Sequence, residues 1–261
     1  MDLGLNGKVA LVSGAGGGLG SAIAGALARE GTWVAACDRD PQALDAVGAQ
    51  LQAQGARFAL VPMDLSRPEQ LGTAVAQIAR DLGSVDVLVN NTGGPPPSPA
   101  SGIAPDTWRS QFEQMVLSVV TLTDLVLPGM RERGWGRVIT STSSGVVAPI
   151  PNLGLSNALR MSLLGWSKTL SREVAPCGIT ANVVLPGRIA TARIDQLDHA
   201  RAEREGRPVQ EVVRESTASI PTGRYGRPEE YGAVVAFLAS AQASYLNGSV
   251  VRVDGGLIPS I

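Results

Sequence analysis

The sequence predicts an α/β fold in which a doubly wound, parallel sheet of about seven strands lies between two layers of helices. Short β-rich runs alternate with longer helical patterns along the 261 residues, and this spacing is typical of parallel βαβ units. No linker, repeat or break in composition divides the chain. We therefore expect one domain over residues 1–261 rather than two smaller ones.

The expected elements follow from hydrophobic patterns. Apolar and β-branched runs predict strands at Val9–Val12, Trp33–Cys37, Ala59–Pro62, Val85–Val89, Arg137–Ile139, Thr180–Val184 and Ser249–Val253. Periodic apolar residues predict helices near residues 19–30, 41–54, 68–83, 105–133, 155–175 and 228–240. Asp40-Pro41 is typical of an N-cap followed by a first-turn proline, and Ser66 to Glu69 has the pattern of a capping box.

Two segments fall outside this alternation. A stretch rich in proline and glycine, Thr92–Gly102, leaves the fourth strand at the edge where α/β sheets bind ligands. Residues 191–222 form a long polar insertion with helical stretches before the last helix. Long insertions in compact domains are commonly lids or binding loops. We expect a substrate lid at 191–222, with a solvated decoration as the alternative.

Composition argues against several kinds of partner. The chain carries 22 basic and 23 acidic side chains without long runs of one sign, so no net field favours nucleic acid or an anionic membrane. The only cysteines, Cys37 and Cys177, fit a reducing cytosol better than a disulfide framework. The N-terminus has no secretory pattern, and no apolar run approaches the ~18–20 residues that cross a bilayer. We expect a soluble cytoplasmic protein that binds neither nucleic acid nor membrane.

The stretch from Val9 to Gly20, VALVSGAGGGLG, runs from an apolar strand through a glycine turn into an apolar helix. Glycines at Gly14, Gly18 and Gly20 allow a tight turn, a close approach of backbone to a pyrophosphate, and packing of the helix start against the strand. Free N–H groups at the helix N-terminus favour phosphates. The pattern predicts a dinucleotide site in a Rossmann-type domain. A tight strand–helix turn without a ligand is the alternative.

The end of the second strand indicates which dinucleotide binds. Asp38 follows the glycines by about 20 residues, and its carboxylate can accept hydrogen bonds from the adenosine ribose hydroxyls. The same charge would repel the 2′-phosphate of NADP, although Arg39 could pair with that phosphate. We expect NAD as the cofactor, with NADP possible. A loop carboxylate in water is the alternative interpretation of Asp38.

Several separate motifs resemble those of the short-chain dehydrogenase/reductase family, in the same order and over nearly the whole chain. The segment Ser13–Gly20 is similar to the family's cofactor turn, with serine in place of the usual threonine. Asp64-Leu65 resembles its adenine contact, and Asn90–Gly93 its Asn-Asn-Ala-Gly stretch. Pro186–Thr191 resembles the segment that holds the nicotinamide carboxamide, and residues 223–230 and 253–256 are similar to its C-terminal signatures. The resemblance implies a reductase of the 3-oxoacyl-carrier-protein type that forms a homodimer or homotetramer.

The resemblance fails at the family's catalytic residues, which are a serine, a tyrosine, a lysine and an asparagine. Aligning Gly165–Leu170 with the family's helix places the tyrosine at Ser156 and the lysine at Arg160. The serine position falls on Ser143 and the asparagine position on Met115. The serine is therefore kept, whereas the other three residues are replaced.

The replacements change the chemistry that the site can perform. Arg160 keeps a positive charge and a fork of donors that can hold ribose hydroxyls, but its pKa above about 12 prevents proton exchange near neutrality. Ser156 is a weaker acid than a phenol, and Met115 offers no hydrogen-bonding group. Ser143 and Ser156 could polarise a carbonyl while water supplies the proton. Capping of the helix by Ser156 and Asn157 is the alternative.

The motifs and the resemblance together imply a set of site residues. The expected catalytic residues are Ser143, Ser156 and Arg160. The expected cofactor-binding residues are Ser13, Gly14, Gly18, Leu19, Gly20, Asp38, Arg39, Asp64, Leu65, Asn91, Gly93, Arg160, Pro186, Gly187, Ile189 and Thr191. No metal site is expected. Pro95–Pro99, Met115, Ile150 and residues 191–222 are expected to shape the substrate pocket.

The expected lid carries further candidates. His199, the sole histidine, could donate a proton because imidazole titrates near neutrality, with a solvated residue as the alternative. Four arginines of the lid could attract an acidic substrate, but acidic residues alternate with them, which favours a solvated mixed-charge helix. These arginines are Arg193, Arg201, Arg204 and Arg207.

The sequence supports three functions in a definite order. The first is an NAD(P)-dependent oxidoreductase that moves hydride between nicotinamide and a small-molecule carbonyl or alcohol. The second is a non-catalytic nucleotide-binding protein, a sensor or assembly partner, and it is motivated by the three replaced positions. The third is elimination or epimerisation on a nucleotide-bound substrate, for which no base is evident.

Overall fold

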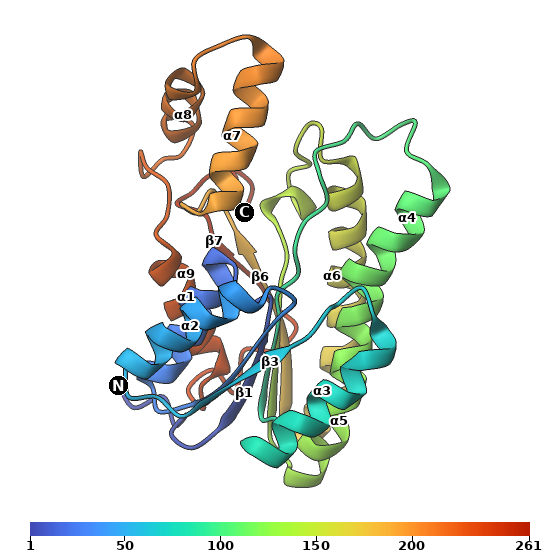
Figure 1. Ribbon diagram of the computed structural model, residues 1–261, viewed down its shortest axis with the longest axis vertical. Helices are drawn as coiled ribbons and strands as arrows, with labels where there is room; N and C mark the ends of the chain where they lie inside the picture. Colours follow the sequence, from blue (N-terminus) through green and yellow to red (C-terminus); the bar gives the residue numbers. More distant parts are fainter.

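The computed structural model describes residues 1–261 and shows helices on both faces of a parallel sheet (Figure 1). Neighbouring strands follow the order β3-β2-β1-β4-β5-β6-β7 and all pair in parallel. The strands are β1 (Val9–Ser13), β2 (Trp33–Asp38), β3 (Phe58–Pro62), β4 (Val87–Asn90), β5 (Gly136–Ser141), β6 (Ile179–Pro186) and β7 (Val250–Val253). The predicted doubly wound α/β fold with seven parallel strands is confirmed.

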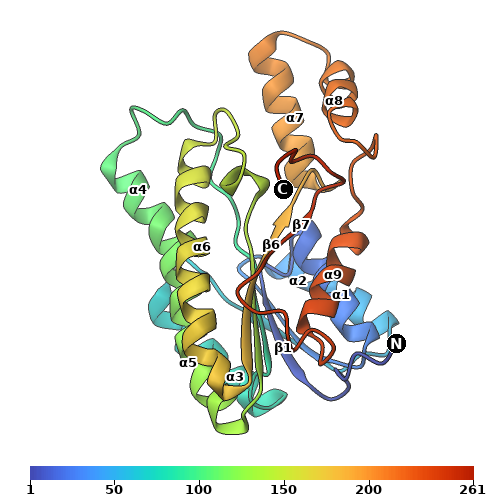
Figure 2. The ribbon, with the colours of Figure 1, turned by 180° about the vertical axis from the view of Figure 1, so that it is seen from behind.

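The helices form a layer on each face of the sheet (Figures 1 and 2). One layer holds α1 (Gly18–Arg29), α2 (Pro41–Ala53) and α9 (Pro228–Ala239), and α1 packs directly against α9. The other layer holds α3 (Pro68–Asp81), α5 (Ser118–Arg133) and α6 (Gly154–Val174). The remaining helices, α4 (Pro105–Phe112), α7 (Ala192–Glu205) and α8 (Val209–Ala218), lie towards the carboxyl ends of the strands.

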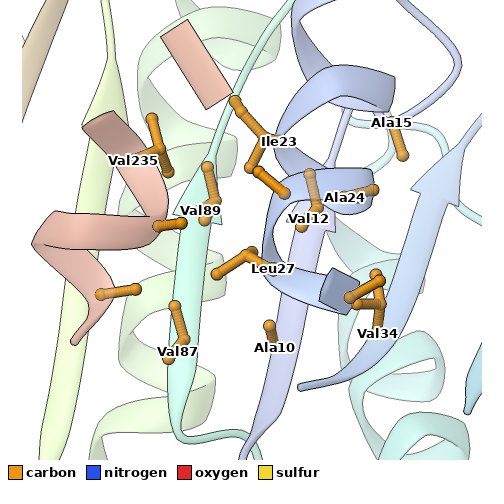
Figure 3. Packing of buried hydrophobic residues seen from close by; sticks show 14 of the residues in the cluster. Ala10, Val12, Ala15, Ile23, Ala24, Leu27, Val34, Val87, Val89 and Val235 are labelled. Atoms are coloured by element: carbon orange, nitrogen blue, oxygen red, sulfur yellow. The ribbon is translucent and has the colours of Figure 1, made fainter. Parts of the chain in front are cut away.

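Two apolar clusters hold these layers to the sheet. In the first, Ile23 and Leu27 of α1 lie against Val12 of β1 and Val89 of β4 (Figure 3). The second cluster contains the β1 side chains that point to the opposite face of the sheet, such as Leu11. Because successive strand side chains point to opposite faces, a strand that is covered on both faces must be apolar throughout. This burial explains the uninterrupted apolar run that begins β1.

The ends of two helices show how polar side chains compete for backbone groups. The predicted cap at Asp40 is confirmed, because its Oδ1 accepts hydrogen bonds from the N–H groups of Gln42 (3.0 Å) and Ala43 (3.3 Å). The predicted capping box at Ser66 is wrong. The Ser66 hydroxyl donates to Asp64 Oδ1 at 2.8 Å, and α3 starts without a side-chain cap. The ionised carboxylate is a strong acceptor, and its hydrogen bond holds the Ser66 hydroxyl away from the start of the helix.

The helix predicted over residues 105–133 is continuous but irregular. Between α4 and α5, Glu113–Leu117 form a π-helical turn, a feature common at functional sites. By length and composition the stretch Pro105–Arg133 could cross a membrane, with a window of mean hydropathy 1.2. This corrects the expectation that no apolar run approached that length. Met115 and Leu122 are buried in the protein, as in a core helix.

Residues 191–222 hold two helices, α7 and α8, which stand beyond the sheet on the side away from α4 and α6 (Figures 1 and 2). The buried Asp198 anchors α7. Its carboxylate accepts hydrogen bonds from Arg188 Nη1 at 2.8 Å and from the Tyr225 hydroxyl at 2.6 Å. These contacts tie α7 to the segment after β6 and to the loop before α9. Whether the pair covers a bound substrate stays a prediction.

Candidate active site

A cavity of about 800 Å³ opens at the carboxyl ends of β1, β2, β4, β5 and β6. The chain leaves β1 towards β2 and β3, then crosses back to place β4 on the other side of β1. This reversal of strand order separates the connecting loops and leaves a crevice between them. The segments that surround the crevice are the glycine turn, the loop after β4, the start of α6 and the first turns of α7.

Most of the residues expected to bind a cofactor line this cavity. They are Gly14, Gly18, Leu19, Asp38, Arg39, Asp64, Leu65, Asn91, Gly93, Arg160, Pro186, Gly187, Ile189 and Thr191. Ser13 and Gly20 do not line it. Ser13 is buried, and its hydroxyl donates to the Asn91 carbonyl (3.1 Å) and accepts from the Asn91 N–H (3.0 Å). Ser13 therefore fixes the position of the loop after β4.

The glycines bring three chain segments together. Gly14 has a φ of +58°, and a Cβ there would lie 2.6 Å from the carbonyl oxygen of Asn91. A Cβ at Gly18 would lie 2.7 Å from Cγ2 of Thr191. Helix α1 starts at Gly18 without a side-chain cap, so its first N–H groups are free to bind an anion. The turn has the bare backbone that close contact with a pyrophosphate requires.

Two carboxylates occupy the far side of the cavity from β4. Asp38 accepts hydrogen bonds from the N–H groups of Gly16 (2.9 Å) and Asp40 (3.1 Å), which fix its orientation at the end of β2. Asp64, after β3, accepts from the Ser66 N–H at 2.9 Å. Burial opposes ionisation of Asp64, but the hydrogen bonds from Ser66 and the charge of Arg39 lower its pKa overall.

All three expected catalytic residues line the cavity. Ser156 and Arg160 lie four residues apart on α6, which puts both on one face of the helix. Ser143, after β5, accepts a hydrogen bond from the Gly145 N–H at 3.1 Å, so its own proton remains free to be donated. Helix capping does not occupy Ser156 or Asn157. The Asn157 amide instead donates to the Ile150 carbonyl at 2.9 Å.

Arg160 is the most constrained charge in the cavity. Its side chain is 7% exposed and donates to the carbonyls of Ser141 (3.4 Å), Thr92 (3.2 Å) and Gly93 (3.0 Å). Burial lowers the pKa of Arg160 to about 10, and the charge of Arg193 acts in the same direction. The guanidinium is therefore still protonated at neutral pH. It presents a fixed cation to whatever the cavity holds.

No tyrosine, lysine or histidine lines the cavity. His199 is exposed on α7, and its Nδ1 lies 2.8 Å from the Asp195 carbonyl oxygen. Tyr231 is fully buried, with its hydroxyl 2.8 Å from Ser141 Oγ, and burial raises its pKa. Neither side chain reaches the cavity in this conformation. The hydroxyls and Arg160 are thus the only expected catalytic groups that the fold brings together.

The substrate side differs from expectation at Met115. That side chain is 1% exposed and packs with Val119 and Leu159 in a separate apolar cluster. Its neighbour Gln114, in the π-helical turn, lines the cavity instead. Sequence reasoning also missed Ser141, Thr142, Ser144, Asn152, Leu257 and Ile258. The run of hydroxyl residues at the end of β5 was a usable signal, whereas nothing in the sequence marked Gln114.

Comparison with known proteins identifies the family. The family model described as enoyl-(acyl carrier protein) reductase matches residues 14–258. Nodulation protein G of Azospirillum brasilense is 37% identical over 251 residues, which cover 96% of this chain and 98% of that protein. A 3-oxoacyl-[acyl-carrier-protein] reductase of Vibrio cholerae is 34% identical over 255 residues, covering 97% and 98%.

A solved structure extends the likeness to three dimensions. L-sorbose reductase of Gluconobacter frateurii, complexed with NADPH and L-sorbose, superposes with a TM-score of 0.94 at 31% identity, and the match covers 100% of both chains. The family model, the relatives and this structure agree over nearly the full length of the sequence. The protein therefore belongs to the short-chain dehydrogenase/reductase family, among the members that resemble 3-oxoacyl-carrier-protein reductases.

Proposed function

We propose that the protein is an NAD(P)-dependent oxidoreductase that transfers hydride between nicotinamide and a carbonyl or alcohol group of a small molecule. The observation that carries this proposal is the buried Arg160, which shares one cavity with Ser143, Ser156 and the glycine turn. The relation to a reductase whose structure contains NADPH and a sugar supports the same class of reaction. The homo-oligomer and the cytoplasmic location stay predictions.

The cavity fits a dinucleotide. Gly14 and Gly18 leave room that a Cβ would fill, and free N–H groups at the start of α1 suit the pyrophosphate. The Asp38 carboxylate at the end of β2 would accept hydrogen bonds from the adenosine ribose, which supports NAD over NADP. Ile189 and Thr191, which line the cavity, would hold the nicotinamide end. When bound, the dinucleotide donates or accepts the hydride.

The side chains of this protein supply polarisation rather than an acid. A carbonyl oxygen gains negative charge during reduction, and preorganised donors stabilise that charge. Ser143 and Ser156 offer hydroxyl protons, and the Arg160 guanidinium supplies a fixed positive charge. Because neither a hydroxyl nor the guanidinium releases protons readily at neutral pH, water supplies the proton that completes the alcohol.

One observation favours a second candidate function. The cavity lacks a lining tyrosine, lysine or histidine, and these are the side chains that most readily move protons near neutrality. A protein that binds the dinucleotide without turnover is consistent with that lining. Both candidates predict cofactor binding, so only a reaction with a substrate separates them.

Oxidation of NADH and of NADPH with ketones, diones and 3-oxoacyl thioesters tests the proposal. Cofactor binding is measured by calorimetry in the same samples. Turnover with any of these carbonyl compounds would support the oxidoreductase. Tight binding of NADH with no hydride transfer across the whole set would favour the non-catalytic function.

Replacing Asp38 by asparagine is expected to shift the ratio of NADH to NADPH affinity towards NADPH by about ten- to a hundredfold. Asparagine keeps an oxygen that can accept the Gly16 N–H but removes the charge that repels a 2′-phosphate. Dissociation constants for both cofactors measure the ratio. Asp40→Asn is the control, because Asp40 caps α2 outside the cavity. An unchanged ratio in Asp38→Asn would contradict the assigned role.

A further inference from the structure

Charged side chains divide the cavity into two unlike parts. Its only carboxylates, Asp38 and Asp64, follow β2 and β3, on one side of β1. Six arginines also line it, at positions Arg39, Arg160, Arg188, Arg193, Arg201 and Arg204. The part of the cavity beyond β1, towards β4 and α7, therefore contains several cations and no carboxylate.

Three of the six arginines are neutralised by carboxylates outside the cavity. Arg188 pairs with Asp198 at 2.8 Å, and Arg201 pairs with Glu205 at 2.8 Å. The third, Arg204, lies 3.5 Å from Glu205. The mixed-charge helix expected from the sequence thus accounts for Arg201 and Arg204. Arg39, Arg160 and Arg193 have no carboxylate within 4 Å, and the charge of Arg39 faces Asp64.

The two remaining cations, Arg160 and Arg193, meet at Gly94. A Cβ on Gly94 would lie 3.3 Å from Nη2 of Arg193 and 3.7 Å from Nη2 of Arg160. Arg193 comes from the first turn of α7 and donates to the Pro95 carbonyl at 2.6 Å. Arg160 comes from α6 and is held by three carbonyls. The two guanidinium groups therefore approach one point from opposite walls of the cavity.

No carboxylate of this chain balances the two charges. Backbone carbonyls satisfy some of the N–H donors but leave both net charges in place, and burial lowers the pKa of each arginine. Two like charges in a partly buried site are unfavourable unless an anion joins them. Guanidinium groups bind carboxylates and phosphates through paired hydrogen bonds. A second cavity of about 520 Å³, lined by Gly94, Arg193 and Arg39 among others, leaves room beside Arg193.

We propose that the substrate carries an acid group, a carboxylate or a phosphate, and that Arg160 and Arg193 hold this group beside Gly94. The inference rests on the proposed function, because it describes the molecule whose carbonyl would be reduced. Gly94 follows β4, whereas the glycine turn suited to the cofactor's pyrophosphate follows β1. Arg193, which is not among the residues expected to hold the cofactor, is therefore available to a second molecule. Arg193 acts as a specificity-determining residue.

The test measures binding without turnover, by calorimetry on the protein saturated with NAD⁺. Because NAD⁺ cannot reduce a ketone, no carbonyl is reduced during the titration, and the absence of NADH absorbance checks that the hydroxyl groups of the second pair of probes are not oxidised. The first pair of probes is 3-oxobutanoate and its neutral isostere 3-oxobutanamide. The second pair, dihydroxyacetone phosphate and dihydroxyacetone, distinguishes a phosphate from a carboxylate. We expect the charged member of at least one pair to bind about tenfold or more tightly than the neutral member.

Two variants test whether the preference for the charged probe depends on the arginine pair Arg160 and Arg193. Arg193→Met is expected to bring the charged and neutral probes to within about threefold of each other. Arg204→Met is the matched control, because Arg204 lies on the same helix and lines the same cavity but faces Glu205. It is expected to retain the preference for the charged probe. NAD⁺ affinity is measured for both variants.

The outcomes separate this inference from the proposed function. Equal binding of charged and neutral probes, or no binding of any of the four, would overturn the acid site. A loss of NAD⁺ affinity in Arg193→Met as large as the loss of acid affinity would assign the pair to the cofactor and also overturn it. A preference for the acid without any NADH oxidation would uphold the acid site and reject the oxidoreductase. Turnover of neutral ketones as fast as oxo acids would support the oxidoreductase and overturn the acid site.

Discussion

Replacing Arg160 by alanine is expected to lower kcat/KM by about a thousandfold or more, the largest kinetic effect that we expect of any cavity side chain. The variant removes the buried cation that would stabilise charge on a carbonyl oxygen. It also leaves the carbonyl of the buried Thr92 without its donor, and an unsatisfied buried group costs about 1–3 kcal/mol. Steady-state kinetics and urea unfolding measure the two losses separately.

Further variants distinguish the charge of Arg160 from its structural role. Arg160→Gln keeps donors for the carbonyls but no charge, so stability should recover more than activity. Arg160→Lys keeps the charge and is expected to recover activity in part. Arg172→Ala, an exposed position on the same helix, should behave as the parent protein. A normal kcat/KM in Arg160→Gln at saturating cofactor would show that the cation takes no part in the reaction.

The features predicted correctly from the sequence are those that depend on local patterns. Seven apolar runs with helical segments between them leave few topologies other than a doubly wound sheet. The glycine turn likewise needs only its own spacing, because Gly14 and Gly18 act through backbone conformation and close approach. The face of α6 that carries Ser156 and Arg160 follows from helical periodicity once that helix is recognised.

The features that escaped prediction depend on competition between polar groups and on departures from regular helix geometry. Ser66 resembles a helix cap, but Asp64 is a better acceptor for its hydroxyl. A π-helical turn changes which side chain of the long helix faces the cavity, so Gln114 lines it and Met115 is buried. Among the arginines of the lid segment, Arg193, Arg201, Arg204 and Arg207 are alike in sequence. Only the fold shows that Arg193 lacks the carboxylate partners that the others have.

Gly20→Ala is expected to destabilise the protein by about 2–3 kcal/mol or more and to abolish dinucleotide binding. A Cβ at Gly20 would lie 2.0 Å from the carbonyl oxygen of Gly14 and 2.8 Å from Cα of Ala15. Both atoms belong to the backbone, so no side-chain rotation relieves the overlap. Helix α1 would have to move away from β1, which would displace the glycine turn. Thermal unfolding and NADH titration measure the two effects.

Two other glycines provide the controls that make this result interpretable. Alanine is normally preferred to glycine inside a helix by about 0.5–1 kcal/mol. Gly165 is exposed in α6, and a Cβ there would meet no neighbouring atom within 4 Å, so Gly165→Ala should raise stability. A Cβ at Gly17 would lie 3.5 Å from the Gly14 oxygen, an ordinary contact, so Gly17→Ala should keep the fold. If Gly20→Ala unfolded at the same temperature as the parent protein, the close contact between α1 and β1 would not determine the geometry of the turn.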